Sequence, residues 1–514
     1  MTHPLLRTKS IEQSLADTDE PEYQLKRSLG ALDLTVFGVG VIIGAGIFTL
    51  TGRVAHNVAG PAVVLSFVVA AVCCALAAMC YAEFASTVPV SGSAYTFSYA
   101  ALGEVFAWII GWDLLLEMVL AVSVVAQGWS AYFGIFLDNL AGLPVGQHVL
   151  PAAMSAGGAV DLPALVLICV LGVLMIVGIT ESARVNLVMV ILKVFIVFFV
   201  IFAGLAFVHP ENWTPFVPDA CVVGAAGCPS ETPGTPGMTQ PLLQAFWHLF
   251  SDAAPSAYGV GGIFAGAALV FFAYIGFDVV ATTAEEAKNP RRDVPIGIIG
   301  SLIICTVLYC VVSLVVTGMV PYDRLDPKGA LAAAFKAPGV DAPWMATLIS
   351  AGAVAGLTTV VLTLMIGSSR LIFAMSRDNL LPMQLAKVHP RFRTPWLVGV
   401  LVTVLTALVA ALTPLGNLEE MVNIGTLSAF VMVSIAVPLL RHRRPDLRRP
   451  FRVPGSPVVP ILSALVCFYL MLNLSVETWL RFVIWLVVGF ALYFAYSFRH
   501  SRVGTGKALG GALR

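Results

Sequence analysis

The feature that most constrains this chain is a series of apolar stretches, each about 20 residues long, that recur from residue 31 to residue 499. A helix of that length crosses the hydrocarbon core of a bilayer. The chain is 58% hydrophobic and 11% charged, whereas a soluble domain carries about 25% charged residues. The predicted fold class is therefore an all-α polytopic membrane protein. The twelve expected spans are 31–55, 61–83, 103–133, 161–180, 185–208, 260–284, 294–320, 343–374, 395–413, 417–440, 457–476 and 479–499.

The composition also excludes several functional classes. With 29 basic and 29 acidic side chains, the chain lacks the positive surplus of a nucleic-acid-binding protein. All eight histidines lie in loops, tails or span ends, which leaves no pair of haem or metal ligands inside the membrane. The segments between spans are too short for a nucleotide-binding domain. We therefore expect no enzyme, no cofactor, no metal, no nucleic acid partner and no nucleotide.

The positions of Lys and Arg predict the orientation of the chain. With the N-terminus inside, 23 of the 29 cations fall on the inner side, five fall on the outer side, and Lys193 lies within a span. Such a bias marks the cytoplasmic side, so we expect a multi-pass plasma membrane protein with both termini in the cytoplasm. The expected parts are a cytoplasmic N-terminal tail (1–30), a core of ten helices (31–440) with an outer loop (209–258), a final helix pair (457–499) and a cytoplasmic C-terminal tail (500–514).

The outer loop contains two cysteines, Cys221 and Cys228, on the side that is exposed to oxidising conditions. A disulfide and a pair of free thiols are both consistent with this position.

Two of the apolar stretches contain glycines near the expected middle of the bilayer. The first, Gly38–Phe48, has four glycines among nine residues, and the sixth, Phe271–Asp278, has Gly276 among aromatic residues. Glycine favours unwinding, although it is also common where membrane helices pack closely. The spacing of five helices between the two stretches favours unwinding, because inverted repeats of five helices would bring matching broken helices to a central site.

Broken helices offer partial charges of both signs to a ligand. Free N–H groups at the start of a half-helix attract an anion such as a carboxylate, and free carbonyls attract a cation such as an ammonium. A site with both suits a zwitterion, of which an α-amino acid is the simplest. Such a closed site favours a transporter over a channel or a receptor. The expected contacts are Gly44, Ala45 and Gly46 for the carboxylate, and Ile42, Phe272, Ala273 and Ile275 for the ammonium.

Charged residues inside the spans are the second functional signal, because each is costly to bury in a bilayer. Lys193 lies in the fifth span, where a lysine can lose and regain a proton. It is a candidate for proton coupling or a substitute for a bound sodium ion, and snorkelling is disfavoured by its depth of about 12 Å. Glu117 lies in the third span, with Asp113 one turn earlier. Glu117 is a candidate for bonding to unwound backbone, for proton transfer, or for attracting a cationic substrate.

Six stretches of the chain match the motifs of one transporter family. They are Gly38–Gly52, Gly111–Glu117, Phe272–Pro290, Arg370–Asp378, Phe451–Pro457 and Thr478–Phe482. In these stretches the chain resembles the cationic amino acid transporter family of the amino acid–polyamine–organocation superfamily, in its bacterial twelve-helix form. The resemblance extends from about Leu29 to Ser501.

The resemblance implies a five-plus-five inverted-repeat (LeuT-like) core with broken helices 1 and 6, plus two further helices. It implies a secondary active transporter that moves an α-amino acid by alternating access, sodium-independent and coupled to protons. The alternative is an amino acid/polyamine exchanger without net proton coupling. It further implies that Lys193 occupies the region of a sodium site beside helix eight, near Thr358 and Thr359, and that Glu117 matches an acidic position of the family. Bacterial relatives also transport neutral amino acids, so the substrate stays open.

Overall fold

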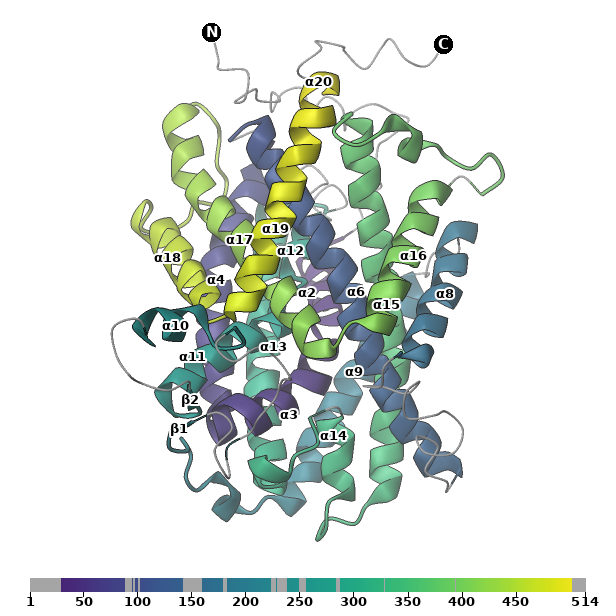
Figure 1. Ribbon diagram of the computed structural model, residues 1–514, viewed down its shortest axis with the longest axis vertical. Coiled ribbons are helices and arrows are strands. Elements are labelled where there is room, and N and C mark those ends of the chain that lie inside the picture. The colour runs from purple at the N-terminus through teal and green to yellow at the C-terminus, as the bar shows by residue number, and fades with distance from the viewer. Residues whose placement is uncertain are drawn as a thin grey trace.

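The computed structural model is a bundle of helices (Figure 1). It describes residues 29–87, 95, 98–99, 102–141, 160–178, 183–222, 228, 238–248, 256–282, 287–327, 329–392 and 394–501. The unbroken helices are α4 (Val63–Thr87), α6 (Glu104–Ala141), α8 (Leu162–Val177), α9 (Ala183–Gly204), α13 (Pro290–Met319), α15 (Pro343–Arg377), α16 (Trp396–Leu412), α17 (Leu415–Arg443), α18 (Val458–Leu472) and α19 (Val476–Leu492), which continues into α20 (Phe498–His500).

Two helices are interrupted, as the glycine-rich stretches predicted. The first consists of α2 (Ala31–Ile42), a π-helical turn (Gly46–Leu50) and α3 (Thr51–Val54) with a second π-helical turn (Ala55–Ala59). The sixth consists of α11 (Gly259–Val270), a 3-10 turn (Phe271–Tyr274) and α12 (Phe277–Thr282). The short elements of the loops are α10 (Leu242–His248), α14 (Ala330–Ala333), β1 (Cys221–Val222) and β2 (Ser256–Ala257).

The described helices support a membrane protein with many spans. Eight helical stretches are long and apolar enough to cross a membrane, and the first of these, Gly46–Thr87, joins the outer half of the first predicted span to the second. Four further apolar helices are shorter than these: Ala31–Ile42, Leu162–Val177, Trp396–Leu412 and Val458–Leu472. Each predicted span coincides with one of these helices or with a broken helix. A helical polytopic fold is thus confirmed, whereas the number of twelve crossings stays a prediction.

The strongest packing occurs between helices in corresponding places of the two predicted halves. The longest helix, α6, lies along α15, and α4 lies along α13, which also packs against α2. In the predicted repeats, α4 and α13 are the second helices, and α6 and α15 are the third. This pairing is the one that an inverted repeat would produce, and the repeat itself stays a prediction.

Large apolar side chains cover much of the outer surface of the bundle. On α9, Phe195 and Phe202 are exposed, and on α19, Ile484 and Val487 are exposed. Contiguous apolar surface of this kind is unfavourable in water, but it costs nothing against lipid tails. The bundle therefore presents the surface expected of a protein surrounded by a bilayer.

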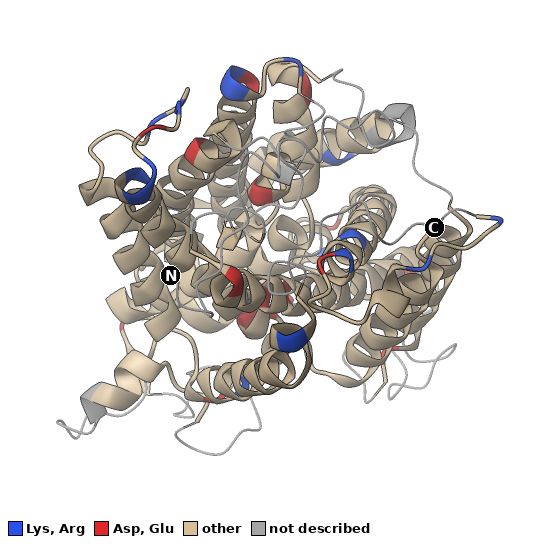
Figure 2. Ribbon diagram, turned by 90° about the horizontal axis from the view of Figure 1, so that it is seen from above, with Lys and Arg blue, Asp and Glu red and all other residues tan. Residues whose placement is uncertain are grey.

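The two ends of the bundle carry different elements. In Figure 1, α20 lies at the upper end, whereas β1, β2 and α14 lie toward the lower end. The strands β1 and β2 pair antiparallel, with Cys221 opposite Ala257, and Cys221 forms a disulfide with Cys228. Of the two alternatives for these cysteines, the structure thus contains the bonded one. Figure 2 shows the bundle from the α20 end, with Lys and Arg positions on helix ends and loops both near the centre and at the edge of the view.

Candidate substrate and coupling site

The first helix is interrupted at Ile43 and Gly44. Its inner half, α2, ends at Ile42, and Ile43 has an extended backbone (φ −70°, ψ 94°). Helical geometry resumes at Ala45 (φ −55°, ψ −27°). The backbone on both sides of the interruption is buried. The carbonyl end of α2 and the N–H end of the outer half therefore face each other inside the protein.

The sixth helix is interrupted at Ile275 and Gly276. Ile275 is extended (φ −59°, ψ 133°), and Gly276 has a φ of 121°, which side chains other than glycine rarely permit. The new half-helix, α12, is capped by its own Asp278, whose Oδ1 accepts the N–H of Gly276 at 3.2 Å. A Cβ atom at Gly276 would lie 2.8 Å from Val41 of α2. This second interruption is thus specified by one glycine and stabilised locally.

The two interruptions lie against each other. A Cβ atom at Gly46 would lie 2.3 Å from Cα of Ala273 and 3.2 Å from its nitrogen. Because both neighbours are backbone atoms, only glycine permits this approach. A Cβ atom at Gly44, in contrast, would lie 3.6 Å from Val360 of α15, which is an ordinary contact. Gly46 therefore joins the two broken helices, whereas Gly44 has room beside it.

A tyrosine that sequence reasoning did not single out connects the carbonyls of both interruptions. The hydroxyl of Tyr309, on α13, lies 2.8 Å from the carbonyl oxygen of Ile42 and 2.9 Å from that of Ala273. The ring is fully buried and packs against Phe67 and Tyr274, at centroid distances of 5.5 and 5.4 Å. A hydroxyl has one proton, so it can donate to one of these carbonyls at a time, and each carbonyl has two lone pairs. Acceptor capacity therefore remains for a ligand.

Other carbonyls near the sixth interruption already accept hydrogen bonds. The Phe272 carbonyl accepts the N–H of Ile275 at 3.1 Å. The side chain of Asn423, on α17, donates to the carbonyls of Ala268 and Leu269 at 2.9 and 3.0 Å. Among the predicted ammonium contacts, the carbonyls of Ile42 and Ala273 thus converge on one hydroxyl, whereas the Phe272 carbonyl accepts a bond within its own turn.

Lys193 reaches the inner half of the broken first helix. Its Nζ donates to the carbonyl of Gly40 at 3.0 Å, and the side chain is 3% exposed. The aliphatic stem lies against Gly356 of α15, where a Cβ atom would be 2.8 Å from Cγ of the lysine. The lysine therefore links helices five and one beside helix eight, and its amine does not snorkel toward the membrane surface.

The two threonines predicted to lie near Lys193 face different neighbours. The hydroxyl of Thr359 donates to the Gly356 carbonyl at 2.8 Å, so it lies one turn from the lysine stem. The hydroxyl of Thr358 accepts a hydrogen bond of 2.9 Å from the indole of Trp129, on α6. Successive residues of a helix point about 100° apart, which explains the difference. Gly356 of the same helix lies directly against the lysine stem.

The predicted acidic residue Glu117 lies in a separate buried group. Its side chain is 3% exposed, and its polar neighbours are Thr426, Asp278 and Asp113. Asp113 itself accepts a hydrogen bond of 2.7 Å from Ser428. Thr426 and Ser428 belong to α17, and Asp278 begins α12. Glu117 therefore lies on α6 close to α17 and to the start of α12. In the described part of the chain, no group of three or more His, Cys, Asp or Glu residues has the arrangement of a metal site.

The outer half of the first helix is also tied to the rest of the bundle. Tyr132 of α6 donates to the carbonyl of Phe48 at 2.6 Å. Arg53 forms an ion pair with Glu419 at the start of α17, and the Glu419 side chain is 2% exposed. Side chains of several helices therefore hold both halves of the first helix in place.

Comparisons with known proteins decide the family. The profile of the amino acid permease family matches residues 29–495. The chain belongs to the amino acid permease family. It is similar to the branched-chain amino acid permease BcaP of Bacillus subtilis (46% identity, 98% of this chain and 100% of the relative). It is also similar to the methylthioribose transporter of the same organism (44%, 97% and 98%), and to the vacuolar cationic amino acid transporter 4 of Arabidopsis thaliana (36%, 86% and 68%).

These matches confirm the resemblance drawn from the sequence motifs. The permease is a multi-pass membrane protein for amino acid transport, and it is not an enzyme. In this conformation of the permease, the side chains at the two interruptions are buried: Ile42 is 2% exposed, Ala45 1%, Phe272 6% and Ala273 1%. These four residues, which the sequence predicts as substrate contacts, are therefore shielded from solvent in the structure.

Proposed function

We propose that this permease is a secondary active transporter that moves an α-amino acid across the plasma membrane by alternating access, independently of sodium and coupled to protons. Its twelve helices would form a five-plus-five inverted repeat with a final helix pair. Both termini would lie in the cytoplasm, which agrees with the distribution of Lys and Arg along the sequence.

The observation that carries the proposal is the convergence of the two interrupted helices. The Ile42 and Ala273 carbonyls meet at one hydroxyl, that of Tyr309. Beside them, the outer half of helix one begins at Gly44 and Ala45, where N–H groups face the interruption. Carbonyls bind an ammonium and helix N-termini bind a carboxylate, so one location would hold both charged groups of an amino acid.

The coupling part of the proposal concerns Lys193. As an ammonium, its side chain makes a charge-assisted hydrogen bond to the Gly40 carbonyl, and such bonds are about twice as strong as neutral ones. Loss of the proton would weaken this bond and release the inner half of helix one. A proton that binds to Lys193 from outside would favour one orientation of helix one, and release of that proton inside would favour the opposite orientation. Thr358, Thr359 and Glu117 would complete the coupling region.

The substrate side chain is proposed to be neutral and aliphatic. Val360 is the nearest neighbour of the open position at Gly44, and an apolar wall suits an apolar side chain. The relative BcaP, at 46% identity, is named as a branched-chain amino acid permease. The relative at 44% is named as a methylthioribose transporter, so an uncharged sugar derivative is the second candidate. Such a ligand would use neither the ammonium nor the carboxylate contacts.

Uptake into proteoliposomes tests the proposal. Labelled leucine, arginine and methylthioribose are supplied with and without an inward pH gradient, and with sodium or choline as the external cation. We expect leucine uptake that rises with the pH gradient and is unaffected by sodium. Uptake that needs amino acid or polyamine inside the vesicles, without an effect of the gradient, would support an exchanger. Transport of methylthioribose alone would contradict the amino acid assignment.

A further inference from the structure

The segment that follows helix α17 carries an unusual density of arginine. Residues 441–452, here called the arginine loop, contain six arginines among twelve residues, and Asp446 is the acidic residue of this stretch. The last turn of α17 forms the start of the loop, and α18 begins shortly after it. The structure divides these arginines into two groups with different surroundings.

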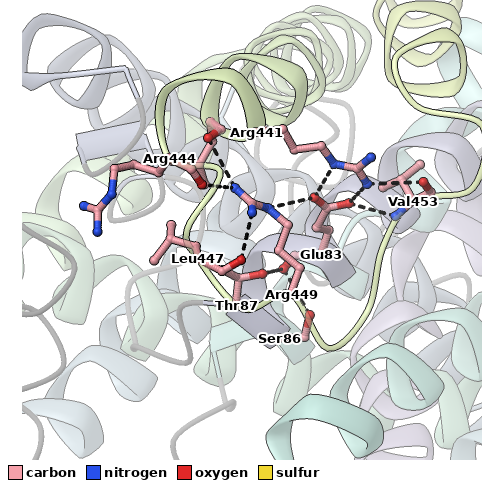
Figure 3. Close-up of polar contacts among 9 residues, drawn as sticks. Glu83, Ser86, Thr87, Arg441, Arg444, Leu447, Arg449 and Val453 are labelled. Atoms are coloured by element: carbon pink, nitrogen blue, oxygen red, sulfur yellow. Dashed lines mark hydrogen bonds and ion pairs between the residues drawn. The ribbon is translucent and has the colours of Figure 1, made fainter.

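The first group points inward and fixes the loop on the end of α4 (Figure 3). The guanidinium of Arg441 donates from Nε to Oε1 of Glu83 at 2.8 Å, and it also contacts the second carboxylate oxygen. The same carboxylate accepts the N–H of Val453 at 2.7 Å. Glu83 is almost fully buried, with a side chain that is 6% exposed. Both ends of the loop are therefore attached to one buried carboxylate.

Arg449 forms the interior of the loop. Its side chain is 5% exposed, and its Nε lies 3.7 Å from Glu83. Its other nitrogens donate to the carbonyls of Leu447 and Arg444, at 2.9 and 2.7 Å. These bonds satisfy carbonyls at and beyond the C-terminus of α17, which a helix leaves without internal partners. The loop thus has a defined conformation, built from buried and charged hydrogen bonds.

The second group of arginines lies closer to the surface of the loop. Arg444 forms an ion pair with Asp446 at 3.0 Å, and this hydrogen bond lowers the pKa of the Asp446 carboxyl. The Arg448 and Arg452 side chains are exposed. Because a guanidinium stays charged in proteins, the loop presents two cations at its surface.

The surroundings place this surface at the edge of the lipid-facing wall. On α17, Ile435 is 50% exposed two turns before the loop. On α18, Val458 is 68% and Ile461 49% exposed directly after it. Apolar side chains on both flanks are suited to acyl chains, and the arginines between them lie where the polar headgroups of a bilayer begin.

We infer that the arginine loop is a binding site for the headgroup of an anionic phospholipid, with Arg448 and Arg452 as the exposed ligands and Glu83, Arg441 and Arg449 as the scaffold. A guanidinium matches the geometry of a phosphate with two parallel hydrogen bonds. Clusters of four to eight basic residues next to the cytoplasmic end of a membrane helix attract anionic lipids. The general excess of cations on the inner side does not require such a fixed loop, because that signal acts during insertion.

The test compares two pairs of cations with equal charge. The purified full-length protein in neutral detergent is titrated with phosphatidylglycerol or phosphatidylcholine, and the thermal unfolding midpoint and the number of bound lipids by native mass spectrometry are measured. The variant R448Q/R452Q alters the arginine loop. The matched control K387Q/R391Q removes two exposed cations from the loop between α15 and α16.

We expect phosphatidylglycerol, but not phosphatidylcholine, to raise the unfolding midpoint of the unaltered protein and of K387Q/R391Q by several degrees. R448Q/R452Q should lose at least half of this rise and one bound lipid, while its midpoint without lipid stays unchanged. The effect should weaken at high ionic strength, because salt screens exposed charges. An equal loss in both variants, or an equal rise with inorganic phosphate, would overturn the assignment of a lipid site to this loop.

Discussion

The interruptions in the first and sixth helices are stabilised in different ways. In the sixth helix, a glycine with positive φ and Asp278, which caps the half-helix α12, stabilise the interruption from within, and Tyr309 adds a bond to Ala273 from α13. In the first helix, the stabilising groups come from other helices: Lys193 bonds to Gly40, Tyr309 to Ile42 and Tyr132 to Phe48. A segment held by groups that can change protonation or position can be released. We therefore expect the first helix to move during transport and the sixth to stay fixed, and the following experiments test this expectation.

The largest effect is expected where the two helices touch. In Gly46→Val the new side chain would overlap the Ala273 backbone, so we expect loss of uptake by more than ~100-fold and lower thermal stability, because overpacking against backbone costs about 3 kcal/mol. Gly44→Ala is the matched control, since its Cβ has room beside Val360. Gly44→Ala should keep the thermal stability of the unaltered protein and change the affinity for the substrate. Normal uptake by Gly46→Val, measured in proteoliposomes, would show that the two helices do not meet as described.

The next largest effect is expected from Lys193→Met, which removes the donor to Gly40 while filling the space beside Gly356. We expect uptake driven by a pH gradient to fall by about 10- to 100-fold, because a hydrogen bond from a charged group contributes about 1.5–3 kcal/mol. Lys387→Met, on the exposed loop after α15, is the control and should behave as the unaltered protein. Full gradient-driven uptake by Lys193→Met would refute the coupling role.

A smaller effect is expected from Tyr309→Phe, which keeps the ring and removes the hydroxyl between the two carbonyls. The concentration of unlabelled α-amino acid that halves the uptake of labelled substrate should rise about five- to tenfold. The reason is that an ordinary hydrogen bond contributes about 1 kcal/mol. The 2-hydroxy acid with the same side chain lacks the ammonium and should be less affected. Tyr274→Phe is the control, because its hydroxyl bonds to Phe67 in the same aromatic group. Equal losses of affinity for both ligands would show that Tyr309 acts through packing and not through the ammonium site.

The smallest effect on transport is expected from Asp278→Ala, in the helix that we describe as fixed. Loss of this cap should lower the unfolding midpoint by about 2–4 °C, because a helix cap contributes about 1 kcal/mol. The affinity for substrate and the response to a pH gradient should stay within about twofold of normal. Asp278→Asn, which keeps an acceptor oxygen for the Gly276 N–H, should recover most of the stability. A strong change in pH dependence would mean that the sixth helix takes part in coupling.

Much of the fold could be predicted from the sequence, because its causes are local. The length of each apolar stretch sets the helices, and the glycines at Gly44, Gly46 and Gly276 mark the interruptions. The position of Lys193 within an apolar span predicts that its charge needs a partner. Which partner it has is a tertiary property, and only the structure provides the Gly40 carbonyl.

The part that could not be predicted depends on helices that meet from distant places in the chain. Tyr309 and Ile42 are separated by 267 residues, and no spacing rule connects them. The signal that was available is the presence of Tyr309 and Asn423 within apolar spans, since buried polar side chains usually have a hydrogen-bond partner. The rotation of α15 about its own axis also could not be predicted from the sequence. The different neighbours of Thr358 and Thr359 were therefore not predicted.

The stretch from Gly46 to Thr87 is helical almost throughout, with the chain reversing at Gly60. It joins the outer half of the first helix to α4 with almost no connecting loop, so the two segments are expected to move as one rigid body. Its first residue, Gly46, lies against Ala273 of the sixth helix at the proposed substrate site, and Glu83 near its far end holds the arginine loop. With the proposed orientation, this stretch would extend from the centre of the bilayer to its inner surface. If its first residues are displaced during transport, we expect the arginine loop and the lipids that it binds to be displaced as well.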